Sequence, residues 1–367
     1  MMIFAGLEAL HMNSFGNNIH LTLFGESHGS AVGCTVERLP AGFIPDLEAV
    51  TFELKRRAPH SGSESTSRMD SNEFELISGF YNGKCTGAPL TVLFRNKDVR
   101  SDDYKTNIPR PAHADLTAKI KYRGFNDPRG GGMFSGRLTL PIVFAGALCK
   151  QLLASRGIRI ASHIQRIGGI ADMNFDPMMT DFPALDPFFP LLNTELRKHI
   201  EDYFAALRKS GNSIGGVVEC AALGFPAGIG EPFFNGLESA ISYILFSIPG
   251  IHGVDFGTGF ELAEMLGSDA NDPILASMKT ATNHAGGING GISNGMPVVF
   301  NAAVKPTPSI SRPQNTVDCI KGEEACLSVT GRHDPAIVRR ICIVITSLTA
   351  IVLCDQLALR FGTDYLR

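Results

Sequence analysis

Tryptophan is absent from this chain of 367 residues, tyrosine occurs only six times, and charged residues make up 19% of the total. The formal net charge is −3 at pH 7, so no global positive field favours nucleic acid, and cationic residues that bind a ligand must act locally. The longest apolar run, 341–354, is shorter than the roughly 20 residues of a membrane-spanning helix. We therefore expect a buried helix there and no membrane segment.

The eight cysteines include no C-x-x-C pair, and most lie in apolar runs. This pattern predicts buried, reduced thiols and therefore a cytoplasmic protein. Residues 1–11 lack the basic region and cleavage pattern of a signal peptide, so we expect a non-essential extension, and Met12 could be the true start.

The common nucleotide motifs are also missing. The chain has no G-x-x-x-x-G-K-[ST] loop and no strand–G-x-G-x-x-G–helix, which disfavours ATP hydrolysis and a Rossmann dinucleotide site. The usual zinc spacings are absent as well. His113 and Asp115 could be two ligands, but we expect no catalytic metal.

Strand and helix patterns alternate irregularly, with no repeat and no Pro/Ser-rich linker, which favours a single domain over 12–360. Residues 60–73 predict a mobile loop and 171–192 an irregular segment. The patterns predict strands at 20–24, 74–80, 90–95, 158–164, 217–222, 254–260 and 297–304. They predict helices after an Asp46 cap to 57, at 137–154, at 193–209 with an asparagine cap, at 235–247 and at 336–360.

The stretch 110–137 combines an imidazole, an acid, several cations and a triple glycine, a set that suits an anionic ligand held close to the backbone near a proton donor. His28 and His113 lie in polar contexts where a proton could move, and Asp115 and Asp334 each follow a histidine that they could orient. The candidate anion ligands are Arg56, Arg57, Arg68, Arg110, Arg129, Arg137, Lys305 and Arg332.

Plainer readings of these patterns stay open. The glycine-flanked segment 25–29 also fits an ordinary turn with an exposed histidine. The basic residues 55–57 also fit a solvated helix end. The glycine-dense loop 283–295 suits backbone N–H groups that converge on phosphate or on a flat ring, and equally a purely structural loop.

Seven motifs in order resemble the chorismate synthase family, from about Asn13 to Leu359. They are FGESHG (24–29), RPAHAD (110–115), KY (121–122), RGGG-x-x-S-x-R (129–137), NHAGGI-x-GGIS-x-G (283–295), KPTPSI (305–310) and GRHDP (331–335). The resemblance implies an α+β fold, a β-α-β sandwich with a helical layer between antiparallel sheets, in a homotetramer. It also implies a lyase that converts 5-enolpyruvylshikimate 3-phosphate to chorismate with reduced FMN and no net redox change.

The resemblance also implies roles for individual residues. Catalysis would fall to His28, which would protonate the reduced flavin or the leaving-phosphate region, to His113 as the other acid/base group, and to Asp334 near flavin N5. Substrate contacts would come from Ser27, Arg57, Arg68, Ser135, Arg137 and Arg332. Flavin contacts would come from Met133, Phe134, Ser135, Pro249, Gly250, Gly290, Lys305, Pro306, Thr307, Pro308, Ser309 and Arg332.

The chain departs from the family pattern at a few positions. Met133 and Ser63 stand where basic or imidazole side chains are usual, His60 replaces a glycine and His252 a frequent lysine, and Ala112 for glycine is expected to be a mild change. Two alternatives therefore stand beside the active lyase: a catalytically impaired flavin- or phosphate-binding relative, and a flavin oxidoreductase that uses NADPH. No reductase domain is visible, so we expect an external flavin reductase.

Overall fold

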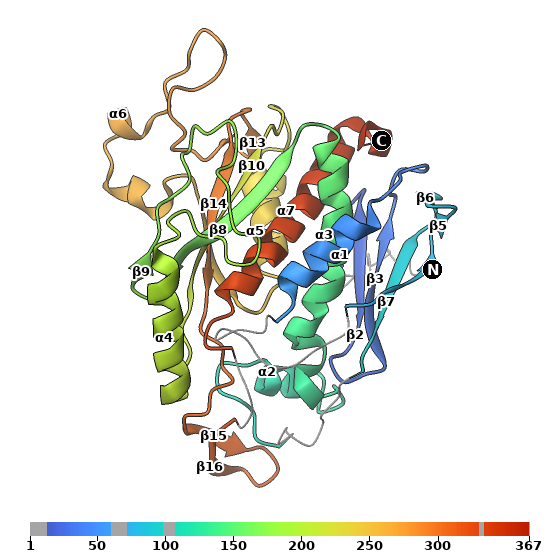
Figure 1. Cartoon of the computed structure of the whole chain (residues 1–367), viewed down its shortest axis with the longest axis vertical. Coiled ribbons are helices and arrows are strands. Elements are labelled where there is room, and N and C mark those ends of the chain that lie inside the picture. Colours follow the sequence, from blue (N-terminus) through green and yellow to red (C-terminus); the bar gives the residue numbers. More distant parts are fainter. Residues whose placement is uncertain (1–12, 60–71, 98–106, 330–333, 367) are drawn as a thin grey trace, which may run out of the picture.

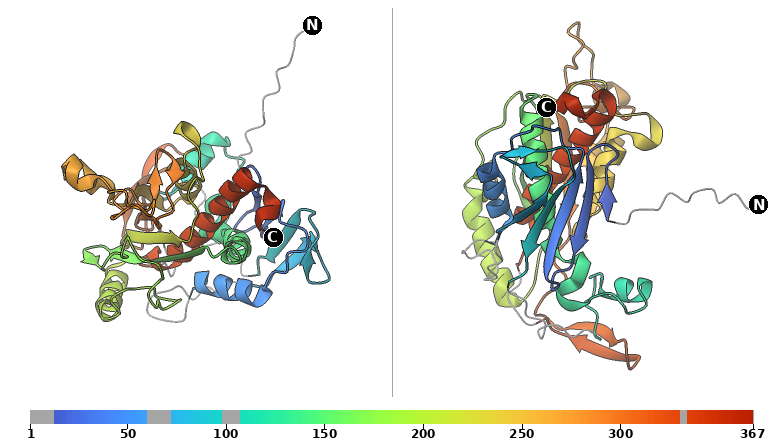
Figure 2. Two further views of the ribbon diagram at one scale, coloured as in Figure 1. Left: turned by 90° about the horizontal axis from the view of Figure 1, so that it is seen from above. Right: turned by 90° about the vertical axis from the view of Figure 1, so that its right-hand side faces the viewer.

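Two antiparallel five-stranded sheets enclose a layer of helices in the computed structural model, which describes residues 13–59, 72–97, 107–329 and 334–366. Figure 1 shows the first sheet on one side of α3 and α7 and the second sheet on the other, and the view from above in Figure 2 shows both helices between the sheets. The expected α+β sandwich is confirmed.

The helices are α1 (Leu47–Arg57), α2 (Asp115–Lys121), α3 (Thr139–Ala154), α4 (Leu196–Ser210), α5 (Leu237–Leu245), α6 (Gly267–Ala270) and α7 (Val338–Phe361). Short 3-10 helices are η2 (Arg129–Phe134), η3 (Gly136–Leu138), η4 (Phe233–Asn235), η5 (Gly259–Glu264) and η6 (Thr363–Leu366). The first sheet has the order β1 (Ser14–Phe15), β2 (His20–Gly25), β3 (Ala31–Glu37), β7 (Leu90–Arg95) and β4 (Glu75–Ser78). The second has the order β11 (Ile251–Phe256), β14 (Val298–Val304), β10 (Gly216–Leu223), β8 (Arg159–Ile167) and β9 (Ile170–Ala171). Three hairpins complete the set: β5 (Phe80–Tyr81) with β6 (Lys84–Cys85), β12 (Ile288–Asn289) with β13 (Ile292–Ser293), and β15 (Gln314–Asp318) with β16 (Glu323–Leu327).

The helical layer is apolar on all sides because both sheets pack on it. The segments 136–154 and 338–361 are long and apolar enough to cross a membrane by composition, yet 78% and 100% of their most apolar windows are buried inside the protein. A helix that is hydrophobic all round belongs in the core of a large protein. Gly146 of α3 lets this helix approach α7 closely, since a Cβ there would lie 2.3 Å from the Cβ of Ser347.

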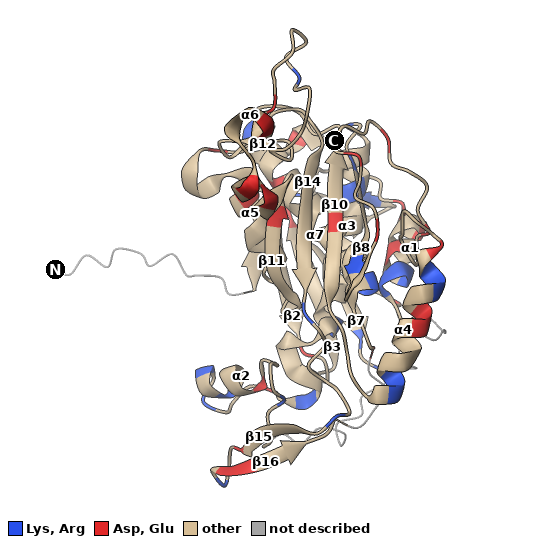
Figure 3. Cartoon of the chain, turned by 90° about the vertical axis from the view of Figure 1, so that its left-hand side faces the viewer, with Lys and Arg blue, Asp and Glu red and all other residues tan. Residues whose placement is uncertain are grey.

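The second sheet is covered on both faces. Val218 and Cys220 of β10 lie in the core with the helices, whereas Ala221 and Leu223 alternate to the opposite face and pack against the irregular segment 171–192. The irregular segment is thus as predicted, and it serves as a cover. Charged residues are sparse on this sheet and more frequent on α4, which lies outside it (Figure 3).

Six of the eight cysteines are buried, as predicted, while Cys319 is half-buried and Cys326 is exposed. Burial raises the pKa of Cys85 to about 11 and that of Cys220 to about 12, because a thiolate is poorly solvated in the core. These thiols are therefore protonated at neutral pH and chemically quiet.

Most predicted elements exist, with some differences at their ends. The helix predicted at 193–209 begins at Leu196 instead, since the Asn193 side chain accepts a hydrogen bond from the backbone N–H of Glu195 in the turn before it. The strand predicted at 254–260 is β11, which starts earlier because it pairs with β14 from Ile251 onward. The predicted loop at 60–73 lies almost wholly outside the described residues.

Candidate active site

A cavity of about 820 Å³ opens where α3 and α7 begin, at the lower end of both helices in Figure 1. This volume lies in the range of roughly 300–1,000 Å³ that is typical of ligand pockets. Six parts of the chain that are distant in sequence form its walls: residues 13–23, the end of α1, the segment 110–142, residues 243–250, the turn 305–309 and the start of α7.

Fourteen of the predicted site residues line this cavity. They are Arg57, His113, Met133, Phe134, Ser135, Arg137, Pro249, Gly250, Lys305, Pro306, Thr307, Pro308, Ser309 and Asp334. Three further predicted residues, Ser27, His28 and Gly290, are described but do not line it. Arg68 and Arg332 lie outside the described residues.

The triple glycine forms the part of the wall that faces both histidines. Gly130, Gly131 and Gly132 have φ angles of 61°, 86° and 54°, a left-handed backbone conformation that residues other than glycine rarely adopt. A Cβ on Gly130 would lie 2.4 Å from Nε2 of His28, and one on Gly131 would lie 3.1 Å from Cε1 of His113. The turn is therefore packed between two imidazoles, so that glycine is required at position 130, beside His28, and at position 131, beside His113.

His28 is only 6% exposed and lies directly behind Gly130. The backbone N–H of Ser27 donates to the carbonyl of Gly132 at 3.1 Å, which ties the end of the loop after β2 to the turn. Ser27 is fully buried, and its Oγ has no hydrogen-bond partner among the described residues. Residues 26–29 do form a turn, closed by the backbone N–H of Gly29, which donates to the carbonyl of Glu26 at 3.1 Å. The predicted alternative of an exposed histidine is wrong, because His28 is buried behind the cavity wall.

His113 is held by a carboxylate. Its Nδ1 lies 2.6 Å from Oδ1 of Asp115 and 3.1 Å from Nη2 of Arg110. Because a carboxylate can only accept, the shorter contact places the proton on Nδ1, and the Arg110 contact is then a close approach rather than a hydrogen bond. This arrangement leaves Nε2 as the nitrogen that can exchange a proton with a ligand.

Arg110 is the ionic partner of Asp115. It donates from Nε at 2.7 Å and from Nη2 at 2.9 Å, and its Nη1 donates to the hydroxyl of Ser309 at 3.2 Å. Burial by itself would raise the pKa of Asp115, but the hydrogen bonds from Arg110 and His113 outweigh it and hold the pKa well below its ordinary value. Asp115 therefore stays ionised, and Arg110, predicted as an anion ligand, acts mainly on this carboxylate.

The turn 305–309 is hydrogen-bonded to three other segments of the cavity wall. Nζ of Lys305 donates to the carbonyl of Ala112 at 2.7 Å, and the hydroxyl of Thr307 donates to the carbonyl of Asp334 at 3.3 Å. The backbone N–H of Lys305 also donates to the carbonyl of Gly250. These bonds fix the turn against both sides of the cavity.

Two arginines supply buried positive charge. Arg57 is 2% exposed and donates to the hydroxyl of Thr139 at 3.0 Å, and Arg137 is 5% exposed and donates to the side-chain oxygen of Asn96 at 3.1 Å. Both side chains line the cavity, where a low dielectric strengthens the attraction between a guanidinium and an anionic ligand.

Two other predicted anion ligands have different partners. Arg56 pairs with Glu53 at 2.7 Å and donates to the carbonyl of Pro187, and Arg129 pairs with Asp127. Neither arginine lines the cavity. For Arg56 the plainer reading of a basic helix end is thus the better one.

The glycine loop 283–295 is mainly structural. Cβ atoms on Gly286, Gly287 and Gly291 would lie 2.4 Å from main-chain atoms of other segments. Gly290 lies in the open turn between β12 and β13, with nothing within 4 Å of such a Cβ. The structure of a single chain does not bring this residue to the cavity.

Sequence reasoning missed several residues that line the cavity. Arg340, near the start of α7, is among them, together with apolar side chains from elements that no motif links, such as Phe15, Tyr243, Phe246 and Ile337. Only the tertiary fold brings these side chains together, so no sequence motif could predict that they line the cavity.

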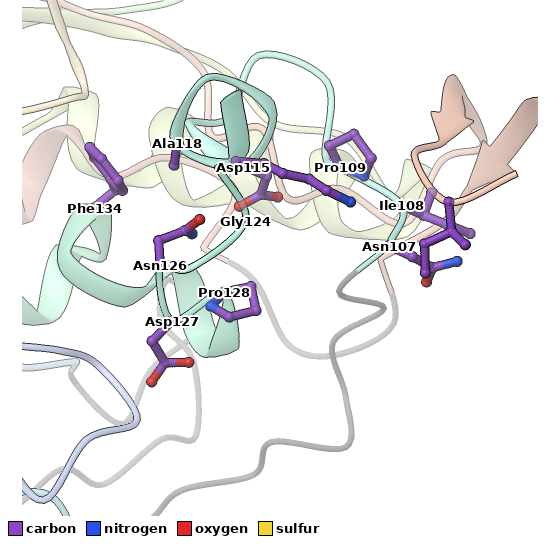
Figure 4. A pocket seen from close by; sticks show the side chains of 13 residues that line it. Asn107, Ile108, Pro109, Asp115, Ala118, Gly124, Asn126, Asp127, Pro128 and Phe134 are labelled. Carbon is purple, nitrogen blue, oxygen red and sulfur yellow. The ribbon is translucent and has the colours of Figure 1, made fainter. Parts of the chain in front are cut away.

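A second, smaller cavity of about 210 Å³ lies between α2 and the segment 124–134 (Figure 4). Asp115, Gly131 and Phe134 contribute to its lining, so it shares residues with the candidate site. Its volume is below the roughly 300 Å³ of a typical ligand pocket.

The large cavity brings buried arginines together with an imidazole that contacts a carboxylate, a set that suits an enzyme for a small anionic substrate. Comparison with known sequences gives the family. The family model described as chorismate synthase matches residues 19–358, so the chain belongs to the chorismate synthase family and is a carbon–oxygen lyase.

Similar proteins agree with this assignment. A chorismate synthase of Thermococcus gammatolerans is 44% identical over 350 residues, which cover 94% of this chain and 97% of that protein. One of Methanosarcina mazei is 43% identical over 95% of this chain and 97% of its own. A crystal structure of a chorismate synthase superposes with a TM-score of 0.72 at 27% identity, covering 95% of this chain and 94% of the other.

Ala112 generates a prediction about stability. Its φ is 58°, so an alanine residue adopts a left-handed backbone conformation at the position where the family usually has glycine. The change from glycine to alanine is therefore less mild than we expected from the sequence. We expect Ala112→Gly to raise the free energy of unfolding by about 1 kcal/mol, since that strain is removed. Urea unfolding of both proteins measures it.

Ala118, inside α2, provides the matched control. Ala118→Gly should lower the free energy of unfolding by about 1 kcal/mol, because glycine disfavours a regular helix. If Ala112→Gly destabilised the protein as Ala118→Gly does, position 112 would not be strained.

Proposed function

We propose that this chain is a chorismate synthase that converts 5-enolpyruvylshikimate 3-phosphate to chorismate by anti 1,4-elimination. The bond from C3 to the phosphate oxygen breaks, a proton leaves C6, and two conjugated double bonds remain, so phosphate is released without net redox change. The observation that carries the proposal is a cavity in which buried arginines face an imidazole that a carboxylate holds.

The substrate's anionic groups need several cations. Arg57 and Arg137, with the hydroxyl of Ser135, line one side of the cavity and would bind its phosphate and carboxylates. Arg68 and Arg332 are proposed for the same task on sequence grounds. These cations would also stabilise the charge on the departing phosphate.

The residues present fit a flavin mononucleotide. The cavity is large, and one part of its lining is apolar, with Phe134, Pro249 and Ile337, while the turn 305–309 offers an amine and hydroxyl groups. We propose that Met133, Phe134, Ser135, Pro249, Gly250 and the turn 305–309 hold it, with Arg332, and that Gly290 would contact it from outside this single-chain cavity. When bound and reduced, FMN supplies electron density as the C3–O bond breaks.

Proton handling falls to residues of this chain. Asp115 keeps the proton of His113 on Nδ1, so Nε2 accepts or delivers a proton at the cavity face. We assign the second acid/base role to His28, which is separated from the cavity by the bare main chain of Gly130. Asp334 also lines the cavity and is proposed to assist proton transfer near the flavin.

We further propose a cytoplasmic homotetramer whose single domain spans 12–360, with 1–11 non-essential, and which receives reduced flavin from an external, NADPH-dependent reductase. Assembly is supported by large apolar side chains that are exposed on one chain, including Phe233, Phe234 and Phe260, each at least 85% exposed.

Phosphate release under anaerobic conditions tests the proposal. The protein should release phosphate from 5-enolpyruvylshikimate 3-phosphate only when reduced FMN is present, because both the cations and the electron-rich ring act on the same C–O bond. Release should be followed with and without reduced FMN, and NADPH oxidation recorded in parallel. No release under either condition would favour the impaired relative, and NADPH oxidation without phosphate would favour an oxidoreductase.

The His113–Asp115 pair predicts a graded series. His113→Ala should fold and bind FMN but lose most turnover, since general acid–base catalysis contributes about 100-fold or more. Asp115→Asn should lose less, because the imidazole remains but its Nδ1–H loses an anionic acceptor. Steady-state kcat with FMN affinity as the control separates the two, and full turnover in His113→Ala would remove this residue from the mechanism.

A further inference from the structure

Arg340 is a charged residue of the cavity wall to which the mechanism above gives no role. It lies in the first turn of α7, lines the cavity, and its side chain is 23% exposed. Its guanidinium makes two contacts of different kinds: Nη1 donates to Oδ2 of Asp334 at 2.8 Å, and Nε donates to the main-chain carbonyl of Arg57 at 3.0 Å.

Each contact fixes a part of the proposed site. Asp334 is 7% exposed, so its carboxylate is largely removed from water and needs a cation close by. Arg57 is the last residue of α1, where helix carbonyls are without intrahelical partners and the helix dipole is negative. One planar guanidinium thus neutralises a catalytic carboxylate and a helix end that carries a substrate-binding arginine.

The fork geometry explains why the residue is an arginine. The two contacts use different nitrogens of one rigid plane, so they set the distance between Asp334 and the end of α1. A lysine at this position has a single ammonium group on a flexible stem and cannot hold both partners in a fixed geometry. Arg57 in turn donates to Thr139 at the start of α3, so these contacts connect α7, α1 and α3.

We propose that Arg340 is a positioning residue: it holds Asp334 and the Arg57 end of α1 at the separation that the reaction requires. This inference rests on the proposed function. It goes beyond that function because it assigns the placement of two proposed site residues to a third one that contacts neither flavin nor substrate in the proposed mechanism.

The neighbouring Arg339 provides a matched control. It lies on the same turn of α7 and is buried, but it donates to the carbonyl of Phe188 at 3.1 Å and does not line the cavity. Loss of Arg339 should therefore lower stability without changing kcat, whereas loss of Arg340 should lower kcat.

The experiment compares Arg340→Met, Arg340→Lys, Arg340→Ala and Arg339→Met in the full chain. Anaerobic phosphate release should show kcat reduced about 100-fold in Arg340→Met, since small misplacements of reacting groups have effects of that order, with KM changed much less. Arg340→Lys should remain close to Arg340→Met, and added guanidinium ion at millimolar concentration should restore part of the kcat of Arg340→Ala. Arg339→Met should keep its kcat and show a lower midpoint of thermal unfolding.

Hydrogen exchange gives a readout that does not depend on activity. The backbone N–H of Ala58 caps α1 by bonding to the carbonyls of Leu54 and Lys55, so amides at this helix end should exchange faster in Arg340→Met and unchanged in Arg339→Met. Unchanged exchange and unchanged kcat in Arg340→Met would overturn the inference. A wild-type protein that releases no phosphate would instead overturn the proposed function, while faster exchange in Arg340→Met would still support the positioning role of Arg340.

Discussion

The left-handed turn of Gly130, Gly131 and Gly132 is the constraint on which the rest of the site depends. Its backbone passes between His28 and His113 at distances that leave no room for side chains. Because it also receives a hydrogen bond from Ser27, it joins the end of β2 to the segment before α3. The two sheets and their helical layer thereby set the spacing of two groups that lie far apart in sequence.

Electrostatics in this protein is local. Although the net charge of the chain is −3, the cavity has positive charge in its wall because Arg57 and Arg137 are buried there. Arg110 keeps Asp115 ionised. Arg340 forms an ion pair with Asp334, another residue of the cavity wall. The cavity is therefore lined by arginines of two kinds. Arg57 and Arg137 are those that we propose to bind the ligand. Arg110 and Arg340 each form an ion pair with a carboxylate of the protein.

Residue types alone predicted an anion site with an acid/base group within 110–137. The residues at 133–137 and in the turn 305–309 were implied by the family resemblance, and the structure shows that they line the cavity. Helix α2 and strand β3 were missed, because a short polar helix and a strand that contains glycine give weak periodicity. The partners of Arg110 and Arg56 could not be predicted either, because the sequence does not distinguish an arginine that binds a ligand from one that pairs with a carboxylate of the protein.

The most direct test of this account is the turnover of Gly130→Ala, compared with that of Gly157→Ala. Gly157 has a φ of 74° but no atom within 4 Å of a Cβ, so it bears the same backbone strain without a neighbouring imidazole. Gly157→Ala should lose about 1 kcal/mol of stability through backbone strain. Gly130→Ala should lose about 1–3 kcal/mol more, because its methyl group also clashes with His28. Only Gly130→Ala should lose phosphate release with reduced FMN, since its methyl group displaces His28. Equal turnover in both variants would contradict the claim that the glycine turn positions the catalytic groups.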